Sequence, residues 1–573
     1  MFDQTRKSIQ RFFEISDMSA NLYSEVTMMR CVRFILVLSG LVTAATGLPP
    51  DIISDWTYDS GFDDWPAACV TDGSGNLYIT GTCNDFSNRN VRTMKYLWDG
   101  TIDFNVSYDG GEDDFVSDLA IDQYGDVYLA AETFQNGDYD ACVIKYDYAG
   151  NEIWRLVADL GGIDKAEGIA VDADDFLHIV GEKSEFGDSD IFLMKATVYG
   201  DTAWTRTYDS GFDDWNARVA LDAWGYGHIA ANVSLDSTTA FRVIKYDWNG
   251  SVEWISQFNS QHSEISRDIA VDNQGDVFVT GFSDTDEGTD IRITKYSSFG
   301  TELWTRIFDG DIYDYALGIV IDGSGSAIIT GSIGNKLSES LVILKYSPSG
   351  DLVWAYIDES QEDMEGFDLT VDVHGYLYVT AVENTEGLHD LRTQIYQQYF
   401  SISGRISDGQ TLVDNVPVRL TGYYDLSDTT DADGTFEFMD LPCAHQYSIC
   451  PDMAGAVFNP SEYEYWSLGW DQADQDFEMT LGGDFPGSDQ SLDLIVENPV
   501  HLGSVIRYYL PSDTRMKLSV YDVTGREIRI LGAGMKAAGM HSEFWPYSCS
   551  GAYLLRLDGN GTTRIRRVVS TKN

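Results

Sequence analysis

The sequence predicts an all-β chain made of a seven-bladed β-propeller and two small β-sandwich domains. Three observations lead to this prediction. A pattern of Asp, Gly, Lys and Trp recurs every fifty residues over most of the chain. The 573 residues include 53 Gly and 33 Tyr but only 12 Pro, a composition typical of many short strands joined by glycine turns. The repeat then stops, and two stretches of alternating apolar and polar residues follow it.

The repeat is anchored by an aspartate that returns every fifty residues. A glycine follows three residues later in every unit except the third, where Asp175 stands instead. A lysine, a second glycine and, in most units, a tryptophan come further along. A fixed period of this length indicates that each repeat is one supersecondary unit. The recurring residues are Asp72, Asp122, Asp172, Asp222, Asp272, Asp322 and Asp372, then Lys95, Lys145, Lys195, Lys245, Lys295 and Lys345, and finally Trp154, Trp204, Trp254, Trp304 and Trp354.

The fifth unit shows which local structure the repeat predicts. Residues 269–271 form a short apolar strand, and 272–275 form a tight turn in which Asp accepts backbone amides and Gly supplies a positive φ. Residues 277–281 return as a second strand, 291–296 alternate as a third, and 302–304 begin a fourth. Four antiparallel strands in about fifty residues is the size of one propeller blade. The repeated Trp is predicted to cap the core between units rather than to contact a ligand.

The ends of the repeat indicate how the ring closes. The seventh unit has no Gly and Trp strand after residue 396, whereas an unassigned strand from Ile52 to Tyr58 precedes the first unit. Using the N-terminal strand as the fourth strand of the last blade would leave no free sheet edge. A linear solenoid is the alternative, and both of its ends would need caps.

The units resemble the bacterial SBBP β-propeller repeat over roughly residues 51–399. The resemblance rests on the D-x-x-G, Y-x-T-G, K-Y and G-x-x-x-W landmarks, carried directly by residues 78–81 and by Lys295-Tyr296. It implies a propeller over residues 48–399 and says almost nothing about function. The third unit departs from it at Asp175 and Ala196.

Residues 400–481 resemble the carboxypeptidase-regulatory-like, prealbumin-type module. The matching landmarks are Gly404, Val416 to Leu420, Asp433-Gly434-Thr435-Phe436 and Leu441-Pro442. The resemblance implies a small β-sandwich that acts as a spacer or an adhesion element. Asp431 and Asp433 are weak candidates for a Ca²⁺ site, which would need further oxygen ligands, and a plain turn is the alternative. Cys443 and Cys450 lie close enough in sequence for a disulfide across a short loop.

After a linker at 482–490, residues 491–573 resemble the type A C-terminal sorting domain of the type IX secretion system, with an Ig-like β-sandwich fold. The match runs through Asn498-Pro499, Ile506-Arg507-Tyr508, Leu510-Pro511, Leu518 to Asp522, Gly525-Arg526, Trp545 and Ser550-Gly551-Ala552-Tyr553. It implies passage across the outer membrane. This segment carries 11 Lys and Arg against 7 Asp and Glu, a change of charge that marks a domain boundary.

The N-terminal region predicts export. Residues 28–47 have a basic start at Arg30 and Arg33, an apolar run over 34–42 and a zone of small residues, which together describe a signal peptide. Residues 1–27 do not fit a signal, and they indicate either a mis-assigned upstream start or a long n-region.

Charge and motifs exclude several functions. A formal net charge of −55 repels phosphate backbones and so excludes nucleic-acid binding. The sequence holds no His pair at metal-ligand spacing, no P-loop and no nucleophile elbow. Residues 59–64 recur as 209–214 and, altered, as 109–114. Their carboxylates suit a solvated loop, a Ca²⁺ site or a glycosidase pair, and their recurrence argues against a single asymmetric active site.

We therefore predict a secreted or outer-membrane-surface protein of a Gram-negative-type bacterium, a monomer without catalytic residues or a confidently assigned cofactor. Its predicted partners are the type IX secretion machinery and an extracellular carbohydrate or protein ligand. No nucleic-acid partner and no transmembrane segment are predicted for the mature chain. The alternative is an extracellular polysaccharide hydrolase or lyase with its site on one propeller face.

Overall fold

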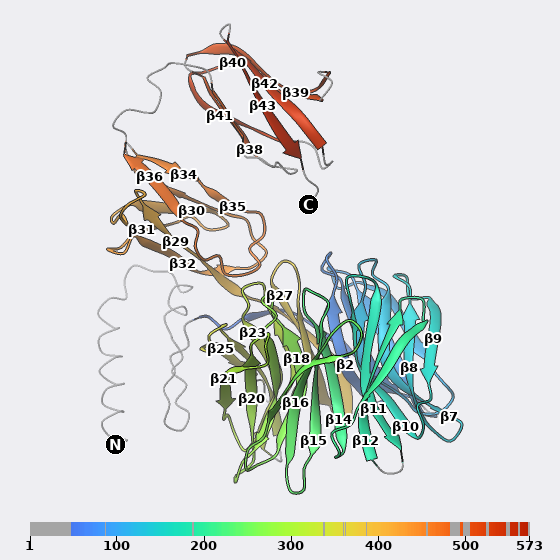
Figure 1. Ribbon diagram of the computed structural model, residues 1–573. Helices are drawn as coiled ribbons and strands as arrows, with labels where there is room; N and C mark the ends of the chain where they lie inside the picture. The colour runs from blue at the N-terminus through green and yellow to red at the C-terminus, as the bar shows by residue number, and fades with distance from the viewer. Residues whose placement is uncertain are drawn as a thin grey trace, which may run out of the picture. The chain divides into compact units, whose positions relative to one another are not determined.

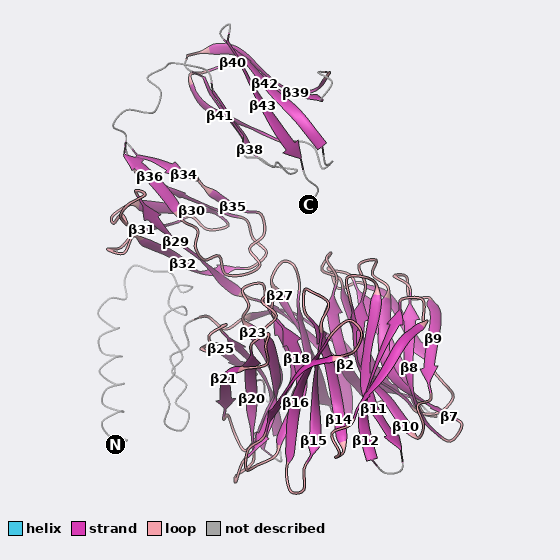
Figure 2. Ribbon diagram, in the orientation of Figure 1, coloured by secondary structure: helices cyan, strands magenta, loops and turns pink. Residues whose placement is uncertain are grey.

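The computed structural model describes the chain from residue 47 to residue 570 with short gaps. Every named element in this part is a β-strand, as Figure 2 shows, so the all-β class is confirmed. None of the described residues belongs to a helix that could cross a membrane. The chain divides into two compact units at about residue 480. The gaps lie at 86, 186–187, 336–337, 359, 361–362, 386, 454–455, 482–492, 497–504, 511, 523–525, 546–550 and 560–561.

Residues 51–397 of the first unit form seven groups of four antiparallel strands (Figure 1). A single parallel bridge between Thr289 and Tyr313 links the fifth group to the sixth. Six groups consist of β2 (Asp64–Thr71), β3 (Leu77–Asn84), β4 (Arg89–Tyr96), β5 (Ile102–Tyr108); β6 (Asp114–Ile121), β7 (Val127–Gln135), β8 (Asp138–Tyr146), β9 (Glu152–Ala158); β10 (Ile163–Val171), β11 (Phe176–Glu185), β12 (Asp188–Thr197), β13 (Thr202–Tyr208); β14 (Asp214–Leu221), β15 (Gly227–Ser234), β16 (Thr239–Tyr246), β17 (Val252–Phe258); β18 (Glu264–Val271), β19 (Val277–Asp284), β20 (Thr289–Tyr296), β21 (Glu302–Phe308); and β22 (Tyr313–Ile321), β23 (Ala327–Asn335), β24 (Ser338–Tyr346), β25 (Leu352–Ile357).

The last group joins the two ends of the repeat region. It contains β26 (Met364–Val371), β27 (Tyr376–Thr385), β28 (Leu388–Gln397) and the N-terminal β1 (Asp51–Tyr58), which pairs with β28. The predicted role of the N-terminal strand is therefore confirmed. The first strand of each group contacts the first strand of the next, and β26 contacts β2. The sheets thus follow one another around a centre, which is a propeller-like arrangement.

The Asp-x-x-Gly motif forms the turn between the first two strands of each group. In the fifth group Oδ1 of Asp272 accepts the backbone N–H of Gln274 and of Asp276, both at 2.9 Å. Gly275 has a φ of +79°. In the third group Asp175 adopts a φ of +61°, a conformation that Asp tolerates better than most residues, so the sequence departure leaves the turn intact.

Neighbouring groups are held together by the repeated Trp and Gly residues. The indole N–H of Trp254, in β17, donates to the backbone carbonyl of Ser298 in the next group at 3.1 Å. A Cβ at Gly300 would lie 2.7 Å from the Trp254 ring, so only glycine lets the ring lie on this turn. The predicted capping role of the repeated Trp is confirmed. Apolar side chains of adjacent groups fill the space behind it, as Phe278 and Ile329 do between the fifth and sixth groups.

The rest of the first unit is a pair of four-stranded sheets. Their strand orders are β32-β29-β36-β34 and β31-β30-β33-β35. Cys443 and Cys450 are both free thiols in this structure. The strands are β29 (Tyr399–Ser407), β30 (Pro417–Gly422), β31 (Leu426–Thr429), β32 (Thr435–Pro442), β33 (Tyr447–Pro451), β34 (Ala456–Asn459), β35 (Tyr463–Tyr465) and β36 (Phe477–Leu481).

The second unit contains two sheets around one core. One sheet has the order β37-β38-β41 and the other β40-β39-β42-β43, and both contribute to a core that includes Tyr508, Leu518 and Trp545. The predicted linker 482–490 lies outside the described residues, as does the signal peptide 28–47 except for Gly47. The strands are β37 (Asp493–Val496), β38 (Val505–Leu510), β39 (Thr514–Asp522), β40 (Glu527–Lys536), β41 (Gly539–Phe544), β42 (Gly551–Gly559) and β43 (Thr562–Ser570).

Candidate functional site

The two most regular charged residues of the repeat form buried ion pairs. Nζ of Lys295 lies 3.1 Å from Oδ2 of Asp272, and it also lies 4.6 Å from the ring centre of Phe278. Sequence reasoning assigned the Asp to the turn alone and did not pair it with the Lys 23 residues later. Asp272 and Lys295 hold the fifth group together and are therefore not available to a ligand. The same pairing occurs in Asp172–Lys195, Asp222–Lys245 and Asp322–Lys345.

A cavity of about 180 Å³ lies where the first strands of six groups meet. Three half-buried aspartates line it, Asp118, Asp268 and Asp368, together with Arg218 and Arg267. Each aspartate accepts a backbone N–H from the next group: Ile169 to Asp118 at 2.8 Å, Ile319 to Asp268 at 2.9 Å, and Cys69 to Asp368 at 2.7 Å. Because each carboxylate accepts such a hydrogen bond, the aspartates around the central cavity tie neighbouring groups together.

Burial also raises the pKa of these carboxyl groups. The pKa of Asp118 is raised to about 6, with Arg218 opposing the effect of burial, and that of Asp268 to about 7. A carboxyl whose folded pKa is raised stabilises the fold below its unfolded pKa, and this contribution is lost as the pH rises through the folded value. The central aspartates therefore disfavour the folded state at neutral and alkaline pH.

We expect the stability of the wild type relative to Asp268→Asn to fall as the pH rises from about 5 to about 8. The measurement is the urea midpoint of both proteins at several pH values. The comparison with the variant is needed because burial lowers the pKa of His178 and of His228, which contribute with the opposite sign. A difference that stays constant, or that rises with pH, would contradict the prediction.

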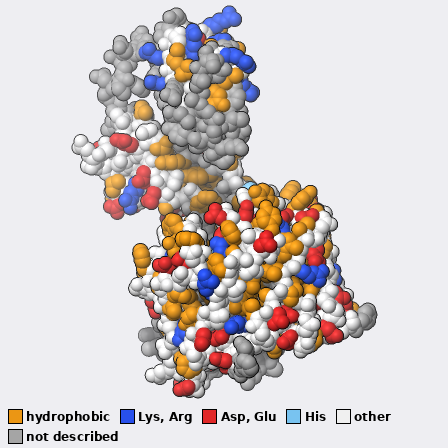
Figure 3. All heavy atoms as spheres, turned by 45° about the vertical axis from the view of Figure 1, so that its right-hand side comes forward, with side chains coloured by type: hydrophobic (Ala, Val, Ile, Leu, Met, Phe, Trp, Pro, Cys, Tyr) orange, Lys and Arg blue, Asp and Glu red, His pale blue; other side chains and the backbone are white. Residues whose placement is uncertain are grey.

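One end of the propeller carries exposed aromatic side chains on its turns. Each lies in a turn between the first and second or the third and fourth strand of a group, and these turns share one end of the sheets. Figure 3 shows hydrophobic side chains along the upper rim of the propeller. We name this set the aromatic face: Trp98, Tyr124, Tyr148, Tyr199, Trp224, Trp248 and Phe299, which are 63% to 85% exposed.

Hydrogen bonds and close packing fix the turns of the aromatic face. The backbone N–H of Tyr148 donates to Oδ1 of Asp126, in the neighbouring turn of the same group, at 3.1 Å. A Cβ at Gly275 would lie 2.8 Å from the ring of Trp224, which therefore reaches across to the next group. The rings are thus held on a rigid frame although they are exposed, and large exposed apolar side chains grouped together indicate a binding surface.

The sixth and seventh groups have no Trp, Tyr or Phe at the turn positions that form the aromatic face, and their turns contact the sheets of residues 399–481 instead. Nδ1 of His374 lies 3.0 Å from Oγ of Ser467, and the ring of Trp470 packs against Gly323. The aromatic face therefore occupies the turns of the five groups that these contacts leave free.

The opposite end holds a second cavity of about 200 Å³, between the sixth, seventh and first groups. It is lined by Trp65, Glu339, Glu365, Asn384 and His389 among others. The rings of Trp65 and His389 lie 4.1 Å apart, centre to centre. Burial and the neighbouring Glu339 raise the pKa of Glu365 to about 7. A carboxyl group that titrates near neutral pH can act as a general acid.

The sequence-predicted calcium candidates form a turn. Oδ1 of Asp431 accepts the backbone N–H of Asp433 and of Thr435, both at 2.9 Å, and Oδ2 accepts the Thr435 hydroxyl. These bonds lower the pKa of Asp431. Among the described residues, neither Asp431 nor Asp433 belongs to a group of three metal-ligating side chains.

Sequence reasoning missed the aromatic face and the second cavity, although both left a signal. A large aromatic ring stands in a polar turn, where it cannot pack into a core, in Trp98-Asp99-Gly100 and in Trp248-Asn249-Gly250. In the second cavity, the first-strand position of Trp65 varies from unit to unit, whereas the position before it is Asp in five of the seven units. The residues at that position are Trp65, Phe115, Lys165, Trp215, Ile265, Tyr315 and Glu365.

No family model and no curated protein matches this chain. Solved structures with a similar fold include the WD40 domain of Neurospora crassa Pan2, with 10% identity, a TM-score of 0.42 and coverage of 61% of this chain and 97% of that domain. An ulvan lyase shares 9% identity with a TM-score of 0.42, covering 59% of this chain and 95% of the lyase. A Dyadobacter fermentans protein of unknown function shares 10% identity with a TM-score of 0.38, covering 61% and 99%. Similarity at this level does not transfer a function.

Proposed function

We propose that the protein is a secreted or cell-surface, non-enzymatic binding protein whose seven-bladed propeller holds an extracellular polysaccharide on its aromatic face. The observation that carries the proposal is the set of seven exposed rings at repeated turn positions. The C–H faces of sugar rings pack on aromatic rings while their hydroxyl groups stay hydrated, so single rings spaced along polar turns suit a sugar chain. Equivalent positions in successive groups suit a ligand that is itself a repeat.

The negative charge of the protein limits which polysaccharides it can bind. The net charge is −55 over the chain and +4 from Ser491 to the end, which leaves −59 on the preceding residues. Figure 3 shows Asp and Glu side chains scattered over the visible face of the propeller. Such a field repels sulfated and uronic-acid chains, so the ligand of the aromatic face is a neutral or cationic polysaccharide.

The experiment that tests the proposal is a glycan array, followed by affinity electrophoresis of the full chain in polysaccharide gels. We expect retention by neutral or cationic polysaccharides without shortening of their chains. Retention by sulfated polysaccharides alone would overturn the charge argument. Absence of binding to every polysaccharide would overturn the proposed function.

A second candidate function is polysaccharide hydrolysis in the cavity of Trp65 and His389. The observation that favours it is Glu365, with a pKa of about 7, beside Glu339, because glycoside hydrolysis uses two neighbouring carboxyl groups, one of them with a raised pKa that lets it act as the general acid. Release of reducing ends by the wild type that is abolished in Glu365→Gln would establish this function. It would also replace the non-enzymatic proposal.

We further propose that residues 400–481 are a carboxypeptidase-regulatory-like spacer and that residues 491–573 direct export by the type IX secretion system. Two features support the latter: these residues lie in a compact unit of their own, and they carry a net positive charge.

Deletion of residues 491–573 is expected to reduce surface display at least about tenfold and to leave the protein in the periplasm, since the sorting signal is removed. The measurement is immunoblotting of periplasmic and surface fractions after expression in a bacterium with this secretion system. A matched deletion of the spacer 400–481 should keep surface display. Unchanged display of the first truncation would contradict the export proposal.

A further inference from the structure

Three carboxylates meet at the junction between the second and third groups. Asp140 lies in β8, Asp159 follows β9, and Asp164 lies near the start of β10. Each offers an oxygen, and these oxygens lie within 4.8 Å of one another. The cluster therefore joins two strands of one group to the first strand of the next.

Two of these carboxylates are buried, and one oxygen of each is left without a hydrogen-bond partner. Asp140 is 3% exposed and Asp164 is fully buried, and Oδ1 of each has no hydrogen-bond partner. Oδ2 of Asp164 accepts the backbone N–H of Leu160, whereas no hydrogen bond or ion pair reaches Asp140 within the described part of the chain. The charged groups nearest to both are further aspartates, Asp138 and Asp159, and burial and these neighbours raise the pKa of both carboxyl groups. Buried charges in proteins are normally paired or bound to a metal.

We propose that Asp140, Asp159 and Asp164 bind a Ca²⁺ ion that ties the second group to the third. Hard oxygen ligands at a flexible spacing suit Ca²⁺, which takes 6–8 oxygens and accepts carboxylates and water together. This inference is independent of the proposed function, because the site lies at the end opposite to the aromatic face.

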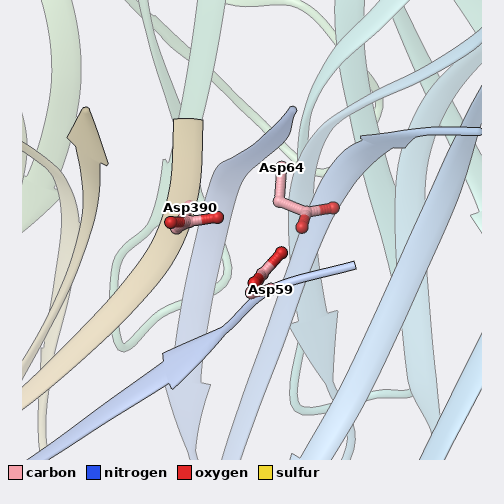
Figure 4. Close-up of side chains that lie close together, drawn as sticks. All are labelled: Asp59, Asp64 and Asp390. Atoms are coloured by element: carbon pink, nitrogen blue, oxygen red, sulfur yellow. The ribbon is translucent and has the colours of Figure 1, made fainter. Parts of the chain in front are cut away.

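The same arrangement recurs at two other junctions. Asp59, Asp64 and Asp390 meet where β1 closes onto β28 and β2 begins, and Figure 4 shows their side chains gathered in one space. A Ca²⁺ ion there would fasten the N-terminal strand to the last repeat. At the junction between the fifth and sixth groups the equivalent residues are Asp290, Asp309 and Asp314, whereas Asp188, Asp190 and Asp209 gather within the third group.

The junction between the fourth and fifth groups is an internal comparison. Ala240 and Asn259 replace two of the three carboxylates there, and Glu264 stands at the innermost position. Glu264 forms a buried ion pair with Arg292, with Nη1 and Oε2 3.2 Å apart. At this junction a side-chain cation thus neutralises the buried acid, whereas no such side chain pairs with Asp140 among the described residues.

The test is calorimetric titration of the EDTA-treated full chain with CaCl₂, together with thermal unfolding in EDTA and in millimolar Ca²⁺. We expect saturable binding, a raised melting temperature and a smaller response to Mg²⁺, which demands stricter octahedral geometry. The Asp140→Asn/Asp164→Asn variant should bind one ion fewer. In EDTA it should melt at or above the wild type, because it lacks the unpaired charges, and in Ca²⁺ it should gain less.

The matched control is Asp174→Asn, which removes one exposed carboxylate at the other end of the third group. It should keep the full number of bound ions and the full Ca²⁺-induced rise. Absence of saturable Ca²⁺ binding by the wild type would overturn the proposal. So would an unchanged number of bound ions in the double variant.

Discussion

Replacement of Lys295 by Met is expected to lower the free energy of unfolding of the propeller by about 3–5 kcal/mol. Lys295 and its partner Asp272 are 5% and 4% exposed, so the variant leaves a carboxylate buried without its counter-ion. The methionine keeps most of the packing volume but supplies no charge. Asp272 also holds the turn through two backbone N–H groups, so the damage extends to the connection between β18 and β19.

Urea unfolding of the full chain, followed by Trp emission, measures this effect. Lys165→Met is the matched control, since Lys165 is 39% exposed and its Nζ lies 3.7 Å from Glu182, a pair expected to contribute less than about 1 kcal/mol. Adding Asp272→Asn to Lys295→Met should restore part of the loss, because an Asn can still accept the turn amides without carrying a charge. A cost below about 1 kcal/mol for Lys295→Met would contradict the prediction and show that Asp272 does not depend on Lys295 as its counter-ion.

The regular features of the repeat allow the fold to be predicted from the sequence. The period, the Asp-x-x-Gly turns and the unassigned strand at 52–58 led to four-stranded sheets and to the pairing of β1 with β28, as the structure has them. The sequence does not predict the ion pair between Asp272 and Lys295. It gives the separation of the two residues along the chain but not the twist of the sheet that brings β20 over the turn. The repeat identifies the positions that the fold requires, but it does not show which side chains contact one another.

The candidate sites were harder to predict from the sequence, because they do not follow the repeat. A ligand site lies where the repeat varies or where a residue contradicts its local environment, as Trp98 does in a polar turn and Glu365 does in a first strand. The carboxylates of residues 59–64 were noticed, but the third ligand, Asp390, lies more than three hundred residues away and belongs to a different repeat unit. Only the closed arrangement of the sheets brings these residues together.

Simultaneous replacement of Trp98, Trp224 and Trp248 by Ala is expected to weaken polysaccharide binding by about 10-fold to about 1000-fold. Each lost ring contact is worth about 0.5–1.5 kcal/mol, and about 1.4 kcal/mol corresponds to a factor of ten. The three rings are 74%, 63% and 65% exposed, so their removal should change the urea midpoint little. Affinity electrophoresis in a gel of the polysaccharide found on the glycan array measures the change.

The control for this variant is Phe212→Ala, which removes an exposed ring, 40% accessible, from a turn at the other end of the propeller. It should bind as the wild type does, because only rings on the aromatic face contact the sugar chain. Single replacements should each cost about tenfold or less, since neighbouring rings keep hold of the same repeating ligand. Binding that survives the triple replacement, or that falls equally in Phe212→Ala, would place the polysaccharide elsewhere and remove the aromatic face from the proposed function.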